Sequence, residues 1–259
     1  MSAHKKSSHR LPWQKILLFL LIVVFAVPIA LFATHNVAQP AGPKPVIVII
    51  GDSNSDPNSI TQVQKWSQDY AMKHANDQIV INFALGGHAV EDFDNEEELA
   101  LIQKAADMIP RDSKVVVVSL LGTNNALMAE KVDTPGDFSQ NYNLFLRKVQ
   151  VILKANYIII GSIPPLYPNP ANLLTTYTPN FNAYKLVDQY NTALENWIQI
   201  FPQMGNARLT YVPLFSPAAY DPAKINTYLI DDGIHLNRNS QLAVLDKVEK
   251  AIQTVLHAD

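Results

Sequence analysis

The sequence predicts an α/β protein with three layers, in which helices cover both faces of a parallel sheet of roughly five strands. Short runs rich in β-branched residues alternate along the chain with longer segments of helical periodicity. The runs carry apolar residues at consecutive positions, as strands do when both of their faces are buried. Alternation of such strands with helices is typical of a doubly wound parallel sheet.

The first strand is expected at residues 46–50, directly before Gly51-Asp52-Ser53. Further strands are expected at 78–83, 114–121, 157–160 and 209–214, and helices at 60–74, 92–109, 137–154, 183–200 and 239–256. Two long irregular segments, 163–181 and 216–228, lie between these elements, and long loops in a compact domain are commonly binding loops. We find no internal repeat and expect one folded domain over residues 45–259.

Composition narrows the classes of function. Hydrophobic residues make up 48% of the chain and charged residues 17%, which excludes bulk disorder. The whole chain carries a charge of -3 and residues 1–15 carry +4, so the remainder carries -7. An acidic body argues against a nucleic-acid partner, because contact with phosphates needs a basic surface. The absence of cysteine removes disulfides, thiolate metal ligands and a cysteine nucleophile.

The N-terminal segment predicts a membrane anchor. Residues 1–15 are polar and basic, residues 16–34 carry no charge, and residues 35–44 form a Pro-containing linker. A helix over 16–34 would span roughly 28 Å, close to the hydrocarbon thickness of a bilayer. The basic residues before it place the N-terminus in the cytoplasm and the domain outside the cytoplasmic membrane. The alternative is a signal peptide cleaved near Ala38, which would leave a secreted or periplasmic protein.

Polar, glycine-containing turns follow three of the predicted strands: Gly51-Asp52-Ser53, Gly86-Gly87 and Gly122-Thr123-Asn124. Because the carboxyl ends of parallel strands lie at one edge of the sheet, these turns are expected there together. Amide groups of Ser53, Gly87 and the Asn124 side chain could then donate hydrogen bonds to an oxyanion.

A serine acts as a nucleophile when a base takes its proton and a further group holds that base in place. His235 is the one histidine of the chain that stands three residues after a carboxylate in a predicted turn, and that carboxylate is Asp232. Asp231 would take the place of Asp232 if the turn were shifted by one residue. We expect no metal and no cofactor, because the acidic residues near Ser53 and His235 do not follow a metal-ligand spacing.

These stretches resemble the sequence blocks of the SGNH hydrolases, also called GDSL esterases and lipases. Gly51-Asp52-Ser53 is similar to the first block, Gly87 to the second, Gly122-Thr123-Asn124 to the third and Asp232-Gly233-Ile234-His235 to the fifth. The resemblance covers about residues 45 to 258 and implies an SGNH (flavodoxin-like) fold. It also implies Ser53 as nucleophile, His235 as base and Asp232 as its partner, with Ser53, Gly87 and Asn124 in the oxyanion hole.

The expected function is that of a membrane-tethered serine ester hydrolase. Its substrates would be small-molecule, lipid or glycan esters, such as lysophospholipids, short acyl esters or acetylated glycans. The same triad would also serve an O-acyltransferase or a carbohydrate O-deacetylase, and a third possibility is a binding domain that kept the fold without activity. Intact Ser53, Asp232 and His235 argue against the third.

Two residues depart from the family pattern. Asn125 stands where the third block usually has aspartate, and we expect this to weaken a hydrogen bond that supports the serine turn. Asn54 stands where leucine frequently follows the serine, which leaves the rigidity of the loop open. Asp52 is expected to tether its own turn.

Other residues near the blocks admit two interpretations. His88 either lines the mouth of the site or is an exposed loop residue. The aromatic residues Tyr167, Tyr177 and Phe181 either form an apolar rim of the site or cover the core.

Overall fold

The computed structural model describes residues 42–127, 134–167, 183–221 and 223–258. Contacts divide the chain into two compact units, 1–42 and 43–259, and the fold described here is that of the second unit. The expected basic segment, the anchor at 16–34 and most of the linker lie outside the described residues. Within the described ranges, no helix has both the length and the hydrophobicity that crossing a membrane requires.

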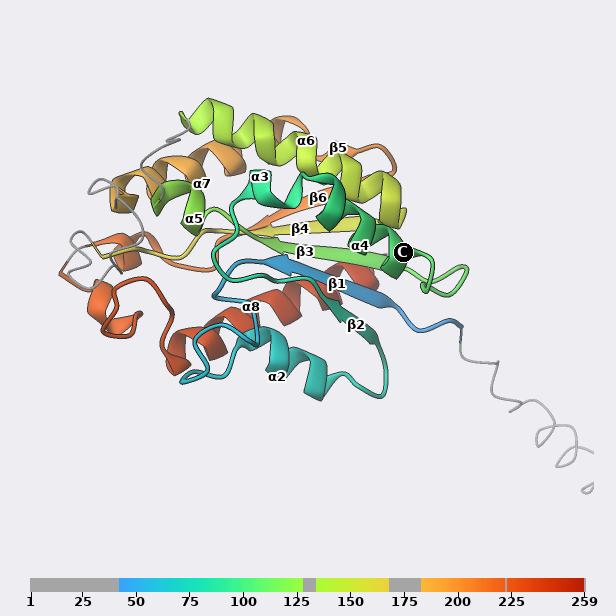
Figure 1. Cartoon of the computed structure of the whole chain (residues 1–259), viewed down its shortest axis with the longest axis horizontal. Coiled ribbons are helices and arrows are strands. Elements are labelled where there is room, and N and C mark those ends of the chain that lie inside the picture. Colours follow the sequence, from blue (N-terminus) through green and yellow to red (C-terminus); the bar gives the residue numbers. More distant parts are fainter. Residues whose placement is uncertain (1–41, 128–133, 168–182, 222, 259) are drawn as a thin grey trace, which may run out of the picture. The chain divides into compact units, whose positions relative to one another are not determined.

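The centre of this unit is a sheet in the order β2-β1-β3-β4-β6-β5 (Figure 1). Its strands are β1 (Val46–Gly51), β2 (Ile79–Asn82), β3 (Val115–Leu120), β4 (Tyr157–Gly161), β5 (Gln203–Met204) and β6 (Ala207–Val212). All neighbours are parallel except β5 and β6. Every residue of β1 and β3 is buried, as expected for strands covered on both faces.

The expectation of about five parallel strands missed β5, which is antiparallel to β6. This strand has two residues and joins β6 through a tight turn at Gly205, whose φ is 57°. Glycine adopts such a left-handed backbone at no steric cost. A strand of this length is too short to produce a readable alternation of apolar and polar residues.

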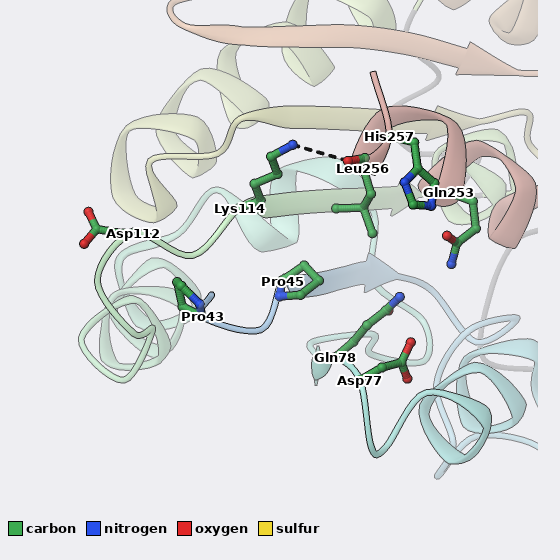
Figure 2. A pocket seen from close by; sticks show the side chains of 9 residues that line it. All are labelled: Pro43, Pro45, Asp77, Gln78, Asp112, Lys114, Gln253, Leu256 and His257. Carbon is green, nitrogen blue, oxygen red and sulfur yellow. Dashed lines mark hydrogen bonds between the residues drawn. The ribbon is translucent and has the colours of Figure 1, made fainter. Parts of the chain in front are cut away.

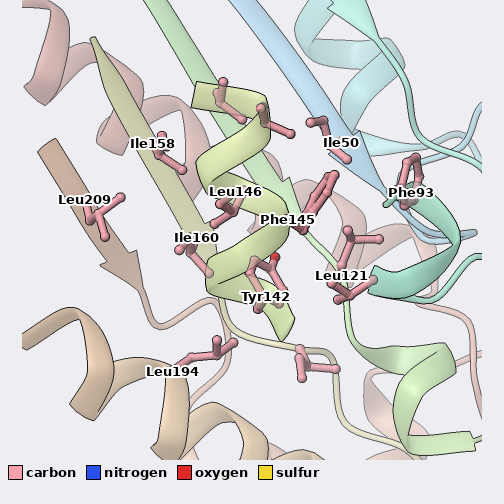
Figure 3. Close-up of a cluster of buried hydrophobic side chains, with 14 of the residues drawn as sticks. Ile50, Phe93, Leu121, Tyr142, Phe145, Leu146, Ile158, Ile160, Leu194 and Leu209 are labelled. Atoms are coloured by element: carbon pink, nitrogen blue, oxygen red, sulfur yellow. The ribbon is translucent and has the colours of Figure 1, made fainter. Parts of the chain in front are cut away.

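Helices cover both faces of the sheet (Figure 1). One face carries α2 (Trp66–Lys73) and α8 (Arg238–Leu256), and the other carries α3 (Val90–Phe93), α4 (Glu96–Ala106), α5 (Thr123–Leu127), α6 (Pro135–Leu153) and α7 (Ala183–Ile200). Side chains alternate along β1, so that Ile47 and Ile49 face the α2–α8 side while Ile50 packs with Phe93 and Phe145 on the other (Figure 3). The second unit is therefore a three-layer α/β/α structure, as predicted.

Two helix predictions differ from the structure, and one helix was not predicted. The helix expected at 60–74 begins only at Trp66, and α5 at Thr123–Leu127 was not expected. The helix expected at 92–109 is two helices, because the chain breaks at Asp94 and Asn95 caps α4 by accepting a hydrogen bond from the Glu98 amide. The Glu98 amide lies in the first turn of α4 and has no carbonyl partner within that helix, so the Asn95 side chain supplies the missing acceptor.

Candidate active site

The turn after β1 presents Ser53 at the carboxyl end of the sheet. The Asp52 carbonyl accepts hydrogen bonds from the amides of Ser55 and Asp56, both at 2.9 Å. The Asp52 side chain accepts a further bond from the Asn54 amide at 3.0 Å, so Asp52 tethers its own turn, as expected. Burial raises the pKa of the Asp52 carboxyl group, although the Asn54 amide, Thr123 and His235 oppose that shift. Ser53 itself is 6% exposed.

A second turn, just before α8, brings an imidazole to Ser53. Nε2 of His235 lies 2.8 Å from Oγ of Ser53, and Nδ1 of His235 lies 2.6 Å from Oδ2 of Asp232. The other carboxylate oxygen of Asp232 accepts hydrogen bonds from the amides of Ile234 and His235, each at 2.9 Å. The carboxylate beside the imidazole is therefore that of Asp232, and not that of its exposed neighbour Asp231.

The surroundings of Asp232 favour its ionised form. Partial burial opposes ionisation, but the hydrogen bonds from the His235 ring and from the His235 and Ile234 amides outweigh it and hold the pKa of Asp232 below its ordinary value. A carboxylate that stays ionised next to Nδ1 fixes the tautomer of His235, leaving Nε2 with its lone pair toward Ser53.

The expected oxyanion donors belong to loops that are bonded to the serine turn and to each other. The Gly86 amide donates to Oδ2 of Asp56 at 2.9 Å, which ties the glycine loop to the serine turn. Nδ2 of Asn124 donates to the His88 carbonyl at 2.9 Å, which leaves its second N–H for another acceptor. Gly87 has a φ of 82°, a backbone that favours glycine, and a Cβ placed on it would meet open space.

One comparison identifies the family of the chain. The model of the GDSL-like lipase/acylhydrolase family matches residues 49–241, a span that includes Ser53 and His235. The chain belongs to this family. The resemblance seen in the sequence blocks is thereby confirmed, and membership of the GDSL-like lipase/acylhydrolase family implies hydrolase activity on esters.

Solved structures share the fold at low sequence identity. A GDSL-like lipase from Bacteroides thetaiotaomicron aligns with a TM-score of 0.60 and 16% identity, over 86% of this chain and 96% of that one. A carbohydrate esterase of family 3 from Talaromyces cellulolyticus gives 0.58 and 14%, over 82% and 98%. An acetylxylan esterase from Geobacillus stearothermophilus gives 0.54 and 15%, over 83% and 96%. The comparison with curated proteins yielded no match.

Asn125, which replaces the usual aspartate of the third block, bonds to other residues than expected. Its Oδ1 accepts a hydrogen bond from the Val90 amide at 3.1 Å, and its Nδ2 donates to the Glu91 carboxylate at 2.7 Å. Both partners belong to α3, which follows the glycine loop, so the prediction that Asn125 affects the serine turn was wrong. An aspartate at position 125 would place its carboxylate against that of Glu91, and the two would repel each other. The amide of Asn125 instead donates a hydrogen bond to Glu91.

Sequence reasoning missed a buried polar network behind the serine turn. The Trp66 amide donates to Oε1 of Gln241, and Nε2 of Gln241 donates to the Asn54 carbonyl. The Trp66 indole donates to Oγ of Ser55 at 3.0 Å, and the Ser67 hydroxyl donates to the Ser55 carbonyl at 2.6 Å. Gln241 occupies the buried stripe of α8 together with apolar residues, and only the tertiary structure shows why that position is polar.

A buried lysine also lies close to this network. Lys65 is fully buried, and its ammonium has no hydrogen-bond partner within the described part of the chain. Burial lowers the pKa of Lys65, while the nearby carboxylates of Asp52, Asp56 and Asp232 oppose that shift. The sequence offered no signal for it, since a lysine after a polar loop is ordinarily exposed.

His88 and three aromatic residues were each open to two interpretations, as part of the mouth of the site or not. His88 is partly exposed, and its carbonyl orients Asn124, whereas its ring nitrogens lie 3.3 Å from the Gly86 carbonyl and 3.8 Å from a Glu98 oxygen. Tyr167 is partly buried and packs against the core on the α2–α8 side, which fits the covering role. Tyr177 and Phe181 lie outside the described residues.

A pocket of about 480 Å³ lies at the opposite end of the strands (Figure 2). Its lining includes Pro45, Gln78 and Lys114, which directly precede β1, β2 and β3. The Lys114 ammonium in this lining donates to the Leu256 carbonyl at 3.2 Å. This pocket is therefore separate from the end of the sheet that carries Ser53.

Proposed function

We propose that this protein is a serine ester hydrolase that forms an acyl-enzyme on Ser53. The observation that carries the proposal is the continuous line of hydrogen bonds from Asp232 through His235 to Ser53, with heavy-atom distances of 2.6 and 2.8 Å. Distances of this size allow direct proton transfer between the serine hydroxyl and the imidazole.

In the first half of the reaction, Nε2 of His235 takes the proton of Ser53 as Oγ attacks the ester carbonyl. The carbonyl oxygen becomes negatively charged and receives hydrogen bonds from the amides of Ser53 and Gly87 and from Nδ2 of Asn124. The imidazolium, stabilised by Asp232, then protonates the leaving alcohol, and the acyl group stays on Ser53.

In the second half, water takes the place of the alcohol. His235 accepts a proton from the water as it attacks the acyl-enzyme, and the same donors hold the second oxyanion. Collapse of this intermediate releases the carboxylic acid and returns the proton from His235 to Ser53. The whole reaction uses groups of this chain, the ester and one water molecule.

The proposal is tested with a fluorophosphonate probe, which reacts with activated serines. The purified protein should be labelled, and Ser53→Ala should abolish both labelling and hydrolysis of a p-nitrophenyl ester. Ser59→Ala is the matched control, because it removes a hydroxyl from the same loop outside the hydrogen-bonded line. Labelling that persists in Ser53→Ala would place the nucleophile elsewhere.

A narrower candidate is the removal of acetyl groups from carbohydrates. The support is that two structural neighbours carry carbohydrate esterase and acetylxylan esterase descriptions, and a further one is an acetyl esterase. A panel of p-nitrophenyl esters of graded chain length, run beside acetylated xylan, tests the idea. Preference for long acyl chains with no release of acetate from the glycan would refute it, and acyl transfer to added alcohols would indicate an acyltransferase.

We further propose that the domain is displayed outside the cytoplasmic membrane. The support is in the sequence: a basic segment at 1–15 precedes the uncharged segment 16–34. A reporter fused after Asp259 should be active only outside the cytoplasm, whereas activity inside would reverse the orientation. Retention of the fusion in the membrane fraction distinguishes an anchor from a cleaved signal peptide.

A further inference from the structure

Asn54 links the two turns that carry the proposed nucleophile and base. It follows Ser53 directly and is 3% exposed. Its Oδ1 accepts a hydrogen bond from the Leu236 amide at 2.9 Å, and Leu236 follows His235 directly. This buried hydrogen bond joins the residue after Ser53 to the residue after His235, which are 182 positions apart.

Hydrogen bonds also hold the backbone of Asn54. Its amide donates to Oδ1 of Asp52 at 3.0 Å, and its carbonyl accepts from Nε2 of Gln241 at 3.2 Å. Gln241 is fully buried and belongs to α8, the helix that follows the His235 turn. Asn54 is thus fixed from the serine side by Asp52 and from the histidine side by Leu236 and Gln241.

We propose that Asn54 is a positioning residue, whose carboxamide oxygen holds the His235 turn at the distance that proton transfer from Ser53 requires. The inference rests on the proposed function, since it concerns the alignment of the same serine and histidine. Leucine, the frequent residue at this position in the family pattern, has no acceptor for the Leu236 amide. In this chain the acceptor is supplied by the residue next to the nucleophile itself.

The serine and histidine turns come from opposite ends of the chain, and their alignment depends on the contacts between them. Besides the Ser53–His235 bond itself, the bond from the Leu236 amide to Asn54 joins the residues that directly follow the serine and the histidine. Without that bond the buried Leu236 amide lacks its acceptor, and the turn would have to move to find another.

Three variants test the proposal by steady-state kinetics and by the rate of fluorophosphonate labelling. Asn54→Leu should lower kcat about 10- to 100-fold with KM within about twofold, because a displacement on the ångström scale acts on the chemical step. Asn54→Asp keeps an acceptor oxygen and should recover part of the lost kcat, because its carboxyl group would be buried in the same turn as Asp52. Asn58→Leu, an exposed asparagine of the same loop, is the matched control and should resemble the unmodified protein.

The outcomes separate this inference from the proposed function. If the unmodified protein does not react with the probe, the proposed function fails. If it reacts and Asn54→Leu reacts equally fast, or Asn54→Leu only lowers Tm at unchanged kcat, the positioning role is overturned. If Asn54→Leu does not fold, Asn54→Ser takes its place, because a hydroxyl on the shorter side chain falls short of the Leu236 amide. Full kcat in Asn54→Ser would contradict the proposal.

Discussion

The two halves of the candidate site are built differently. In the half that contains Ser53 and His235, the serine turn is buried, and side chains of the turn and of α2 and α8 hold it by hydrogen bonds. In the half that contains Gly87 and Asn124, both loop glycines are exposed and Asn124 is partly exposed. This exposed half is held by hydrogen bonds that involve the side chains of Asp56, Asn124 and Asn125.

The difference follows from what each half would have to do. Proton transfer needs two heavy atoms kept at hydrogen-bond distance before substrate arrives, and a buried network keeps them there. Oxyanion donors must instead remain available to the substrate, and the exposure of Gly87 and Asn124 fits that requirement. Disrupting the proton-transfer pair itself should therefore cost more activity than removing one oxyanion donor.

The largest effect is expected for Asp232→Asn. The amide would retain an acceptor for the Ile234 and His235 amides but would place an N–H toward Nδ1 of His235, which favours the tautomer with Nε2 protonated. That imidazole cannot accept the Ser53 proton, and kcat should fall by about 10³- to 10⁴-fold. Asp231→Asn, a change of the exposed neighbouring carboxylate, should stay within about twofold of the unmodified protein. Equal losses in both variants would contradict the assignment.

A smaller effect is expected for Asn124→Ala. Loss of one oxyanion donor typically costs about 10²- to 10³-fold in kcat, or about 3 to 4 kcal/mol of transition-state stabilisation. Because the donor acts on charge that develops during reaction, kcat and kcat/KM should fall by the same factor. Asn124→Asp keeps the shape but replaces the donor with a carboxylate, and should be impaired at least as much. A change in KM alone would mean that Asn124 contacts the substrate and not the oxyanion.

The contrast between the halves also shows which parts of the molecule the sequence could predict. The run at 46–50 and the helix at 183–200 were predicted closely, because burial on known faces imposes a periodicity on neighbouring residues. The positions of Ser53 and His235 could be predicted from strand ends and from a recurring motif. The family was recognisable because its blocks each stand at such a boundary.

Bonds between distant loops could not be predicted in this way. Asn54 and Leu236 are 182 positions apart, and Asn125 and Glu91 are 34 apart. Neither pair follows a period or belongs to one element, so only the packed structure shows which polar groups meet. Asn54 and Asn125 looked like losses relative to the family pattern, and both side chains have specific partners in this chain.

The smallest effect is expected for Asn125→Asp, which restores the residue usual in the family. The new carboxylate would still accept from the Val90 amide but would face the Glu91 carboxylate without a donor between them. Unfolding in urea should show a loss of about 1 to 2 kcal/mol. Activity should fall less than tenfold, because the anchor on Val90 is retained.

Glu91→Gln in the same background should recover most of the stability, and a double-mutant cycle measures this coupling. Additive effects of the two substitutions would show that the Asn125–Glu91 contact does not stabilise this half of the site.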